Sequence, residues 1–434
     1  MGRSMFSVKK KKETGHMSDN GSGKGSLLTR LNQPLFKKKE ELADEEYMLD
    51  SDLQVSQVAS TKNKSITSLF STKKGKGGKN AGQPYTMFSK PIKGNLLAID
   101  FDDYDLTLVV AKQKRKELEI VKTVKSSLPA GLVHDGLIIN MDALIEFIDH
   151  LMKENDVVAK YAFFAVNNTG VIARPVMVPD AVAEEDIENF ISFELQQYLD
   201  IDTSSYIIDY QFSPQADGMI EEGSKSLIAY AVPKATVEQH YDLADALHLV
   251  PYVFDLRSNT YEKWLERVEA INNRGKYLTE GNIGIVQLGK HSIDVYLYAN
   301  GRFVTSNHMD HGYHEIEDLV DTELTMRHFH EIVAGNMTDL SLKRVLDEWL
   351  NETKMHIINT ERFFSSTTGE TIDKFYSIGE GALCWHLISV LKTKFDGDIE
   401  AVGSVDSEDI VWGPYADNDP EMIPAVAMLI RRAN

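Results

Sequence analysis

A strand–turn–strand pattern occurs twice in the sequence at a fixed distance, and this duplication limits the possible folds more than any other feature. Residues 95–110 (NLLAIDFDDYDLTLVV) align without a gap on residues 282–297 (NIGIVQLGKHSIDVYL), at an offset of 187 residues (282 − 95). Each copy continues through a polar turn into a third strand pattern. A period this long indicates a duplicated domain and not a solenoid, so we expect an α/β protein with two related halves.

Helix and strand patterns alternate after each copy, as an α/β fold requires. We expect further strands at 161–166, 171–177, 206–212, 226–232, 250–254, 374–378 and 399–402. We expect helices at 141–154, 183–199, 234–247, 257–271, 319–333, 341–362, 382–394 and 422–432.

Charge divides the chain into two parts. Residues 1–93 carry 18 Lys and Arg against 9 Asp and Glu, whereas residues 94–434 carry 28 against 57. The acidic body argues against a globular nucleic-acid-binding protein, while the basic part suits an anionic surface or the acidic body itself. The single cysteine, Cys384, argues against a disulfide scaffold. No apolar run approaches the roughly 18 to 20 residues of a membrane span, so we expect a cytoplasmic protein.

The basic part has little apolar surface with which to offset its conformational entropy. Lysine runs lie at 9–12 and 37–39, and a Lys- and Gly-rich stretch covers 73–82. We therefore expect 1–93 to be a disordered basic tail, either a solvated linker or a weak attachment to anionic lipid, with no nucleic-acid partner. No apolar core follows the early lysines, which argues against a signal peptide. Leucines between 27 and 35 form an island that we expect to fold on a partner or to occupy a groove of the body.

Four segments of the body carry a resemblance to a known family. They are 127–148 (SLPAGLVHDGLIINMDALIEFI), 174–202 (RPVMVPDA and then ISFELQQYLDID), 231–259 (AVPKATVEQHYDLADALHLVPYVFDLRSN) and 418–430 (NDPEMIPAVAMLI). In their order and spacing, the body resembles type IV pilus assembly proteins of the PilM type, members of the actin-like ATPase superfamily related to the division actins. The resemblance covers nearly all of residues 94–434.

The resemblance implies an α/β, duplicated actin-like (ribonuclease-H-like) fold with a small inserted subdomain, preceded by the disordered basic tail. It places the first inner subdomain at 94–173, the insert at 174–252, and the second half, with its inner and outer subdomains, at 253–434. It also implies a scaffold of a type IV pilus or type II secretion-like machine, peripheral at the inner face of the cell membrane. Contacts with other machine components and a homo-oligomer are further expectations.

The resemblance also implies a partner. In the family, a groove between the first inner subdomain and the insert binds the cytoplasmic N-terminal peptide of PilN, a bitopic inner-membrane protein. The segment expected to form the helix of the insert borders this groove. Most of its apolar residues fit an ordinary core, so we assign Phe193, Glu194 and Tyr198 to the partner-peptide groove.

In this superfamily the turn after each first strand wraps the phosphates of ATP, and an aspartate at the strand end organises Mg²⁺. The first turn keeps Asp100 but has Asp102 where the family prefers glycine, and the second keeps Gly289 but has Gln287 where the family has aspartate. We therefore expect a degenerate site that binds ATP with Mg²⁺ weakly or not at all, and we name no catalytic residue. The candidate cofactor-binding residues are Asp100, Asp102, Gln287, Gly289, Lys290, Gly379 and Gly381.

Two other functions and one metal site are weighed against this interpretation. One is a nucleotide-dependent polymerising or membrane-tethering actin-like cytoskeletal protein. Another is a haloacid-dehalogenase-like phosphatase with Asp100 as nucleophile and Asp102 as general acid, which leaves the repeat unexplained. The third is a zinc site formed by three histidines with Asp310 or Glu315, for which we prefer a polar turn because no cysteine ligand accompanies them. These histidines are His308, His311 and His314.

Overall fold

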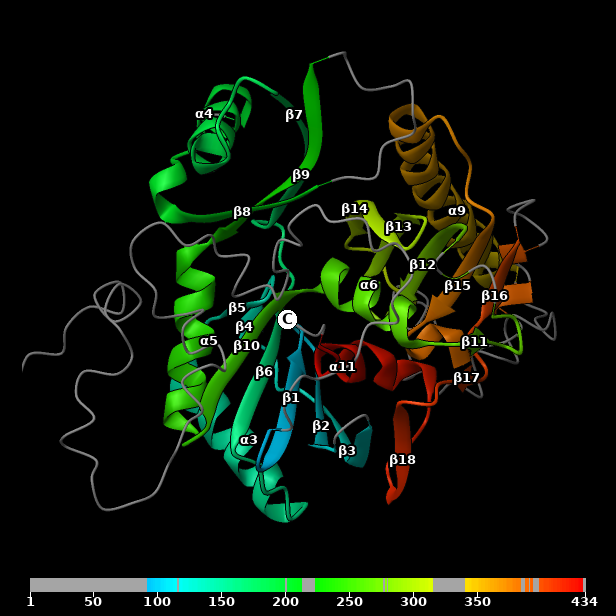
Figure 1. Ribbon diagram of the computed structural model, residues 1–434. Coiled ribbons are helices and arrows are strands. Elements are labelled where there is room, and N and C mark those ends of the chain that lie inside the picture. The colour runs from blue at the N-terminus through cyan, green and yellow to red at the C-terminus, as the bar shows by residue number, and fades with distance from the viewer. Residues whose placement is uncertain are drawn as a thin grey trace, which may run out of the picture. The chain divides into compact units, whose positions relative to one another are not determined.

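A computed structural model describes most of the chain from residue 92 to residue 431 (Figure 1). Residues outside the description are 1–91, 115–116, 200, 213–222, 276–277, 279, 315–339, 384–386, 390, 393–397 and 432–434. The expected disordered tail with its leucine island, the helix at 319–333 and Cys384 therefore lie outside the described residues.

The first half is built on a mixed sheet in the order β10-β6-β1-β2-β3-β18. The first three strands in the chain are antiparallel neighbours, while β6 and β10 run parallel to β1. Their bounds are β1 Asn95–Phe101, β2 Asp105–Gln113, β3 Leu118–Ser127, β6 Tyr161–Val166, β10 Val250–Leu256 and β18 Ile410–Tyr415. A small hairpin of β4 (Val133–His134) and β5 (Leu137–Ile138) follows β3.

The second half repeats this arrangement in the order β14-β13-β12-β15-β16. The bounds are β12 Asn282–Leu288, β13 Ile293–Ala299, β14 Arg302–Met309, β15 Lys374–Ile378 and β16 Ile399–Ala401. Phe101 pairs with Leu106 at the end of the first hairpin, and Leu288 pairs with Ile293 at the end of the second. Both pairs obey the 187-residue offset, so the duplication predicted from the sequence holds down to the register of the hairpins.

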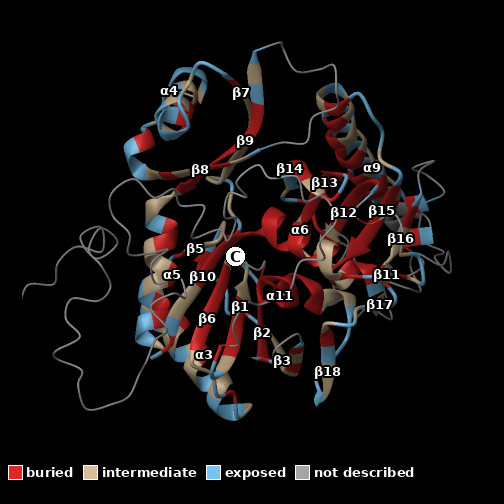
Figure 2. Cartoon of the chain, viewed as in Figure 1, coloured by how far each residue is buried: buried red, intermediate tan, exposed pale blue. Residues whose placement is uncertain are grey.

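The central strands are buried on both faces, which explains their nearly continuous apolar sequences. Residues 96–98 in β1 are completely buried, as are residues 285–286 in β12 (Figure 2). One core cluster extends from Leu97 in the first half to Tyr298 in the second. Burial on both faces of β1 and β12 therefore favours continuous apolar residues over the alternating pattern of a half-exposed strand.

The insert is a separate three-stranded antiparallel sheet in the order β7-β9-β8, with one long helix packed on it. Its elements are β7 Ile172–Pro179, α4 Ile187–Leu199, β8 Tyr206–Phe212 and β9 Ser224–Pro233, with short 3₁₀ helices at Glu184–Asp186 and Thr203–Ser205. Ile187, Ile191 and Leu195 recur every four residues and bury one face of α4 against the sheet. The insert therefore has a core of its own.

The longer helices lie close to their expected positions. Their bounds are α3 Met141–Glu154, α5 Lys234–Ala246, α6 Arg257–Arg267, α9 Leu340–Thr368 and α11 Ile423–Met428. The side chain of Asn140 accepts the N–H of Ala143 and so caps the start of α3. The helix expected at 257–271 ends at Arg267, because Ala270–Ile271 forms strand β11, which pairs with β17 (Val405–Asp406).

The C-terminal segment returns to the first half, whereas the sequence-based division assigned all of 253–434 to the second. Strand β18 pairs with β3, and the buried helix α11 packs against β1, β2 and α6. Gly413 and Pro414 break the apolar pattern of β18, which explains why no strand was expected there. Strand β10, which the division at 252 cuts, also lies wholly in the first sheet.

Candidate functional site

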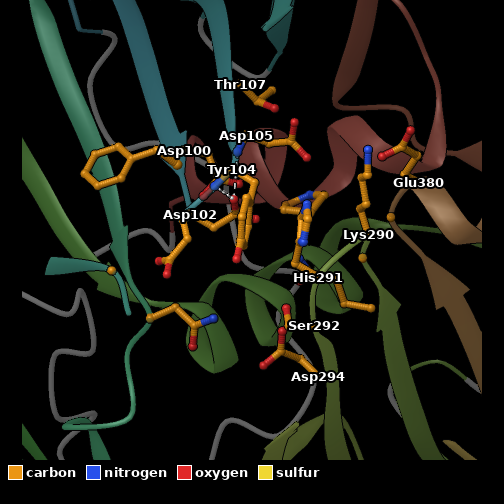
Figure 3. Close-up of a pocket in the computed structure, with 18 of the residues that line it drawn as sticks. Asp100, Asp102, Tyr104, Asp105, Thr107, Lys290, His291, Ser292, Asp294 and Glu380 are labelled. Atoms are coloured by element: carbon orange, nitrogen blue, oxygen red, sulfur yellow. Dashed lines mark hydrogen bonds between the residues drawn. The ribbon is translucent and has the colours of Figure 1, made fainter. Parts of the chain in front are cut away.

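The turns of the two repeated hairpins face a single cavity of about 440 Å³. Six of the seven predicted cofactor-binding residues line it, and the seventh is Gly381, where an added Cβ would come within 2.8 Å of Leu288. The six are Asp100, Asp102, Gln287, Gly289, Lys290 and Gly379. Tyr104 and His291 lie between the two turns in Figure 3.

Carboxylates dominate the lining of the cavity. Among the described residues, nine acidic side chains line it: Asp100, Asp102, Asp103, Asp105, Asp135, Asp294, Asp310, Glu380 and Glu421. Three Lys or Arg residues in the described part of the chain accompany them: Lys125, Arg257 and Lys290. A concave surface with this excess of negative charge repels a polyphosphate and attracts cations.

Asp100, the residue expected to organise Mg²⁺, is held by Arg257. The Nη1 atom of Arg257 donates to Oδ2 of Asp100 at 3.0 Å, and Nη2 donates to Oδ1. The two side chains are only 6% and 13% exposed. Although burial opposes the charge of Arg257, the Asp100 carboxylate raises the pKa of Arg257 above its ordinary value. Both oxygens of Asp100 are therefore engaged by a permanent cation.

Asp102 stabilises its own turn. Its Oδ1 accepts the backbone N–H groups of Tyr104 and Asp105, each at 2.8 Å. These are the bonds of an Asx turn, in which a side chain replaces a backbone acceptor. Although Asp102 is open to the cavity, its partial removal from solvent raises its pKa to about 6. The first turn therefore has a carboxylate, engaged by its own backbone, at the position where glycine was expected.

An aromatic stack joins the two turns. The rings of Tyr104 and His291 are stacked, with centroids 3.3 Å apart and an interplanar angle of 18° (Figure 3). The ring of His291 also contacts that of His314, at a centroid distance of 4.4 Å. Loss of solvent, and then the charges of His314 and Lys290, lower the pKa of His291 to about 4. His291 is therefore neutral at physiological pH, and the stack fills the space between the hairpins.

Backbone hydrogen bonding and close packing stabilise the conformation of the second turn, residues 287–292. The N–H of Gly289 donates to the carbonyl of Ser292 at 2.9 Å, and a Cβ on Gly312 would come within 1.9 Å of the Lys290 carbonyl. Gly379 has φ +83° and lies against Leu288. These glycines are explained by the close approach of neighbouring chain segments, so a nucleotide is not needed to account for them.

Gln287 and Lys125 are engaged by other residues of the protein. The hydroxyl of Tyr261 donates to Oε1 of Gln287 at 2.6 Å. The Nζ atom of Lys125 lies 2.7 Å from Glu421 and 3.5 Å from Glu380. Although burial opposes its charge, these two carboxylates raise the pKa of Lys125. Arg257 and Lys125, which both line the cavity, are thus bound to carboxylates.

The three candidate zinc ligands point to different partners. His308 lies 2.7 Å from Asp294 and 2.9 Å from Asp310, and the hydrogen bond to Asp294 chiefly raises the pKa of His308 to about 9. His311 stacks on Trp349, and His314 contacts the Lys290 carbonyl. Within the described residues no group of three His, Cys, Asp or Glu side chains is arranged to hold a metal ion.

The residues assigned to the partner groove lie on α4, on a different element from the cavity. Phe193 and Tyr198 are 60% and 64% exposed, and Glu194 is half-buried. The guanidinium of Arg174 in β7 lies 5.4 Å from the centre of the Tyr198 ring. The outer face of α4 therefore presents two large aromatic side chains to solvent.

Sequence patterns did not identify the residues that decide the chemistry of the cavity, namely Arg257, Tyr261, Tyr104 and His291. One signal was present for Arg257, because a charged residue directly after an apolar strand lies at a sheet edge where ligands bind. The residues here do not fit Mg-ATP, because Arg257 engages both oxygens of Asp100, the carboxylate expected to organise Mg²⁺, while Asp102 and Gln287 lie where glycine and aspartate were expected. No helix in the described part of the chain has the length and hydropathy that a bilayer crossing requires.

Comparisons with known proteins agree with this fold. Residues 98–403 match the family described as type IV pilus assembly protein PilM. Among solved structures, the chain is similar to one described as the PilM-PilN type IV pilus biogenesis complex, with 17% identity over 77% of this chain and 97% of that chain and a TM-score of 0.58. That similarity is evidence for the fold, and the duplicated actin-like fold predicted from the sequence is confirmed.

Two further structures are similar at lower scores. One is the ethanolamine utilization protein EutJ from Carboxydothermus hydrogenoformans, with 11% identity over 79% of this chain and 92% of that chain and a TM-score of 0.41. The other is MreB 5 of Spiroplasma citri bound to AMPPNP, with 10% identity over 78% of this chain and 96% of that chain and a TM-score of 0.42. No curated protein matches the sequence.

Proposed function

The chain belongs to the type IV pilus assembly protein PilM family, and from that membership we propose that it is a cytoplasmic, actin-like scaffold with a degenerate ATP site. The ion pair between Arg257 and Asp100 carries the proposal, because it engages both oxygens of the carboxylate that Mg²⁺ would need. The nine carboxylates of the cavity support it, since they disfavour a polyphosphate.

A PilN-like protein is the proposed partner, bound through its cytoplasmic N-terminal peptide. One of the solved structures that resemble this chain is described as a PilM-PilN complex. On this chain, the exposed aromatic rings of Phe193 and Tyr198 lie on α4, and Glu194 between them offers a carboxylate to a basic or polar group of the peptide. Aromatic side chains that combine a large apolar surface with few rotatable bonds are common at binding sites.

The setting of the scaffold follows from the same proposal. Binding a bitopic inner-membrane protein would hold the chain at the inner face of the cell membrane, in a type IV pilus or a type II secretion-like machine. Contact of the basic residues 1–93 with anionic lipid would add to this attachment. Other machine components and a second copy of the chain are further proposed contacts.

The nucleotide part of the proposal is tested by isothermal titration of the full chain with Mg-ATP. We expect no heat of binding. Binding at micromolar strength would overturn the degenerate site and favour the nucleotide-dependent cytoskeletal alternative, for which ATP-dependent filaments are the next observation to seek. The phosphatase alternative needs Asp100 as a free nucleophile, and the ion pair with Arg257 speaks against it.

The partner part is tested by fluorescence anisotropy with a labelled N-terminal peptide of a PilN-type protein from the same organism. Phe193→Ala and Tyr198→Ala should each weaken binding by about tenfold, as expected for aromatic anchors. Phe212→Ala is the matched control, because Phe212 is an exposed aromatic residue of the same insert on β8. Unchanged affinity in both α4 variants would remove α4 from the binding site.

A further inference from the structure

One face of helix α6 contacts the two strand ends at which the actin-like ATPase superfamily has metal-organising aspartates. Arg257 binds Asp100 at the end of β1, and Tyr261 donates to Gln287 at the end of β12. The two α6 residues are four apart, so they lie on the same face of the helix. We infer that α6 supplies a built-in cation, Arg257, that occupies Asp100 and thereby excludes a divalent metal, and with it Mg-nucleotide, from the cleft. This inference rests on the proposed function, since it names the residue that prevents the degenerate site from binding Mg-ATP.

The position of Arg257 is set by the sheet. Strand β10 ends at Leu256, and α6 begins at the next residue. Strand β6 separates β10 from β1, so the guanidinium spans the end of β6 to reach Asp100. The planar guanidinium donates through two nitrogens to the two carboxylate oxygens, a geometry that lysine does not reproduce.

The helix cannot easily withdraw this cation. Residues 257–265 of α6 are all buried (Figure 2). The carboxylate of Glu262 accepts the backbone N–H of Phe303 at 2.7 Å, and Lys263 donates to the Ile430 carbonyl at 2.7 Å. These bonds attach α6 to both the second half and the C-terminal segment, and they fix the backbone that carries Arg257.

Exclusion of a metal follows from the chemistry of the pair. Mg²⁺ and Mn²⁺ prefer carboxylate oxygens, but a metal at Asp100 would have to displace Arg257 and leave a guanidinium buried without its counter-ion. The remaining carboxylates of the cavity then attract cations in general without forming a chelating site within the described residues. Removal of the guanidinium should release Asp100 beside Asp102 and so create an affinity for metal.

The test uses Mn²⁺ alone as probe, measured by electron paramagnetic resonance on the full-length chain without nucleotide. Arg257→Met should bind Mn²⁺ about tenfold or more tightly than wild type, a change within the range that neighbouring groups exert on metal sites. The double variant Arg257→Met/Asp100→Asn should return to the wild-type level. Tyr261→Phe is the matched control on the same helix face, and it should gain no Mn²⁺ affinity because Asp100 stays occupied.

Three results would overturn the inference. They are an unchanged Mn²⁺ affinity in a folded Arg257→Met chain, a gain that survives Asp100→Asn, and wild-type Mn²⁺ binding that Asp100→Asn abolishes. The last comparison does not need Arg257→Met, so it decides the question even if that variant fails to fold. Failure of this inference is distinguishable from failure of the scaffold proposal, because wild-type titration with Mg-ATP and binding of the partner peptide are measured separately.

Discussion

The two hairpin turns have the same backbone frame and opposite chemistry. In the first, residues 100–105, four carboxylates surround a turn that Asp102 stabilises through its own side chain. In the second, residues 287–292, the turn depends on glycines and on the close packing of the chain around 312. The comparison shows that the apolar strands preserve a duplicated fold while the turns, which lie outside the core, diverge freely.

The largest expected effect breaks the second turn. A Cβ at position 312 would lie 1.9 Å from the Lys290 carbonyl, so Gly312→Ala should lower the free energy of unfolding by about 3 kcal/mol or more. Gly131→Ala is the control, because φ is +83° there but no atom lies within 4 Å of the added Cβ; it should cost about 1 kcal/mol. Urea unfolding measures the free energy of unfolding of both variants. Equal losses would mean that backbone strain, and not the contact with the Lys290 carbonyl, accounts for the effect of Gly312→Ala.

Removal of the stack between the turns should have a moderate effect. Tyr104→Ala deletes the ring that lies on His291 and should lower the free energy of unfolding by about 1 kcal/mol, the usual contribution of an aromatic pair. Tyr415→Ala, at a tyrosine that is 74% exposed, should change it by less than about 0.5 kcal/mol. If Tyr104→Ala behaves like Tyr415→Ala, the stack does not hold the turns together.

Two histidines of the second half should respond to pH in opposite directions. The pKa of His308 is raised to about 9, so its stabilisation is complete below its unfolded value of 6.5 and is lost as pH rises through 9. The pKa of His291 is lowered to about 4, so its stabilisation is present above 6.5 and is lost as pH falls through 4.

Thermal unfolding between pH 4 and 10 tests this contrast. His308→Gln should flatten the alkaline side of the stability profile, by less than about 1 kcal/mol because the side chain is 35% exposed. His291→Asn should flatten the acid side instead. A profile in which the two variants change the same limb would contradict the assignment of the charges.

The smallest expected effect concerns the first turn. Because the pKa of Asp102 is raised to about 6, its protonated carboxyl group contributes its full stabilisation below the unfolded value of 3.8, and this contribution is lost as pH rises through 6 and the group ionises. Asp102→Asn keeps the acceptor of the Asx turn and removes the charge, so it should stabilise the chain by a few tenths of a kcal/mol at pH 8 and have no effect at pH 3. Asp103→Asn, which breaks the ion pair with His134, should show no such gain.

Local patterns predicted the elements well where burial and turn chemistry agree. The helix Met141–Glu154 and the strand Tyr161–Val166 have the bounds expected from the sequence. Strand β18 was not expected, because it holds Gly413 and Pro414 and gains its place only by pairing with β3. The early end of α6 was also not expected, because β11 forms only against β17, more than a hundred residues later.

The sequence by itself determined the duplicated hairpin and its register, and it predicted six of the residues that line the cavity, because apolar strand patterns and turn lengths are properties of short segments. The tertiary structure decided what that cavity can bind. Arg257 and Asp100 are 157 residues apart, and Tyr104 meets His291 only because the halves fold against each other. The sequence gives the charge of each side chain, but packing between distant elements determines which partner neutralises that charge.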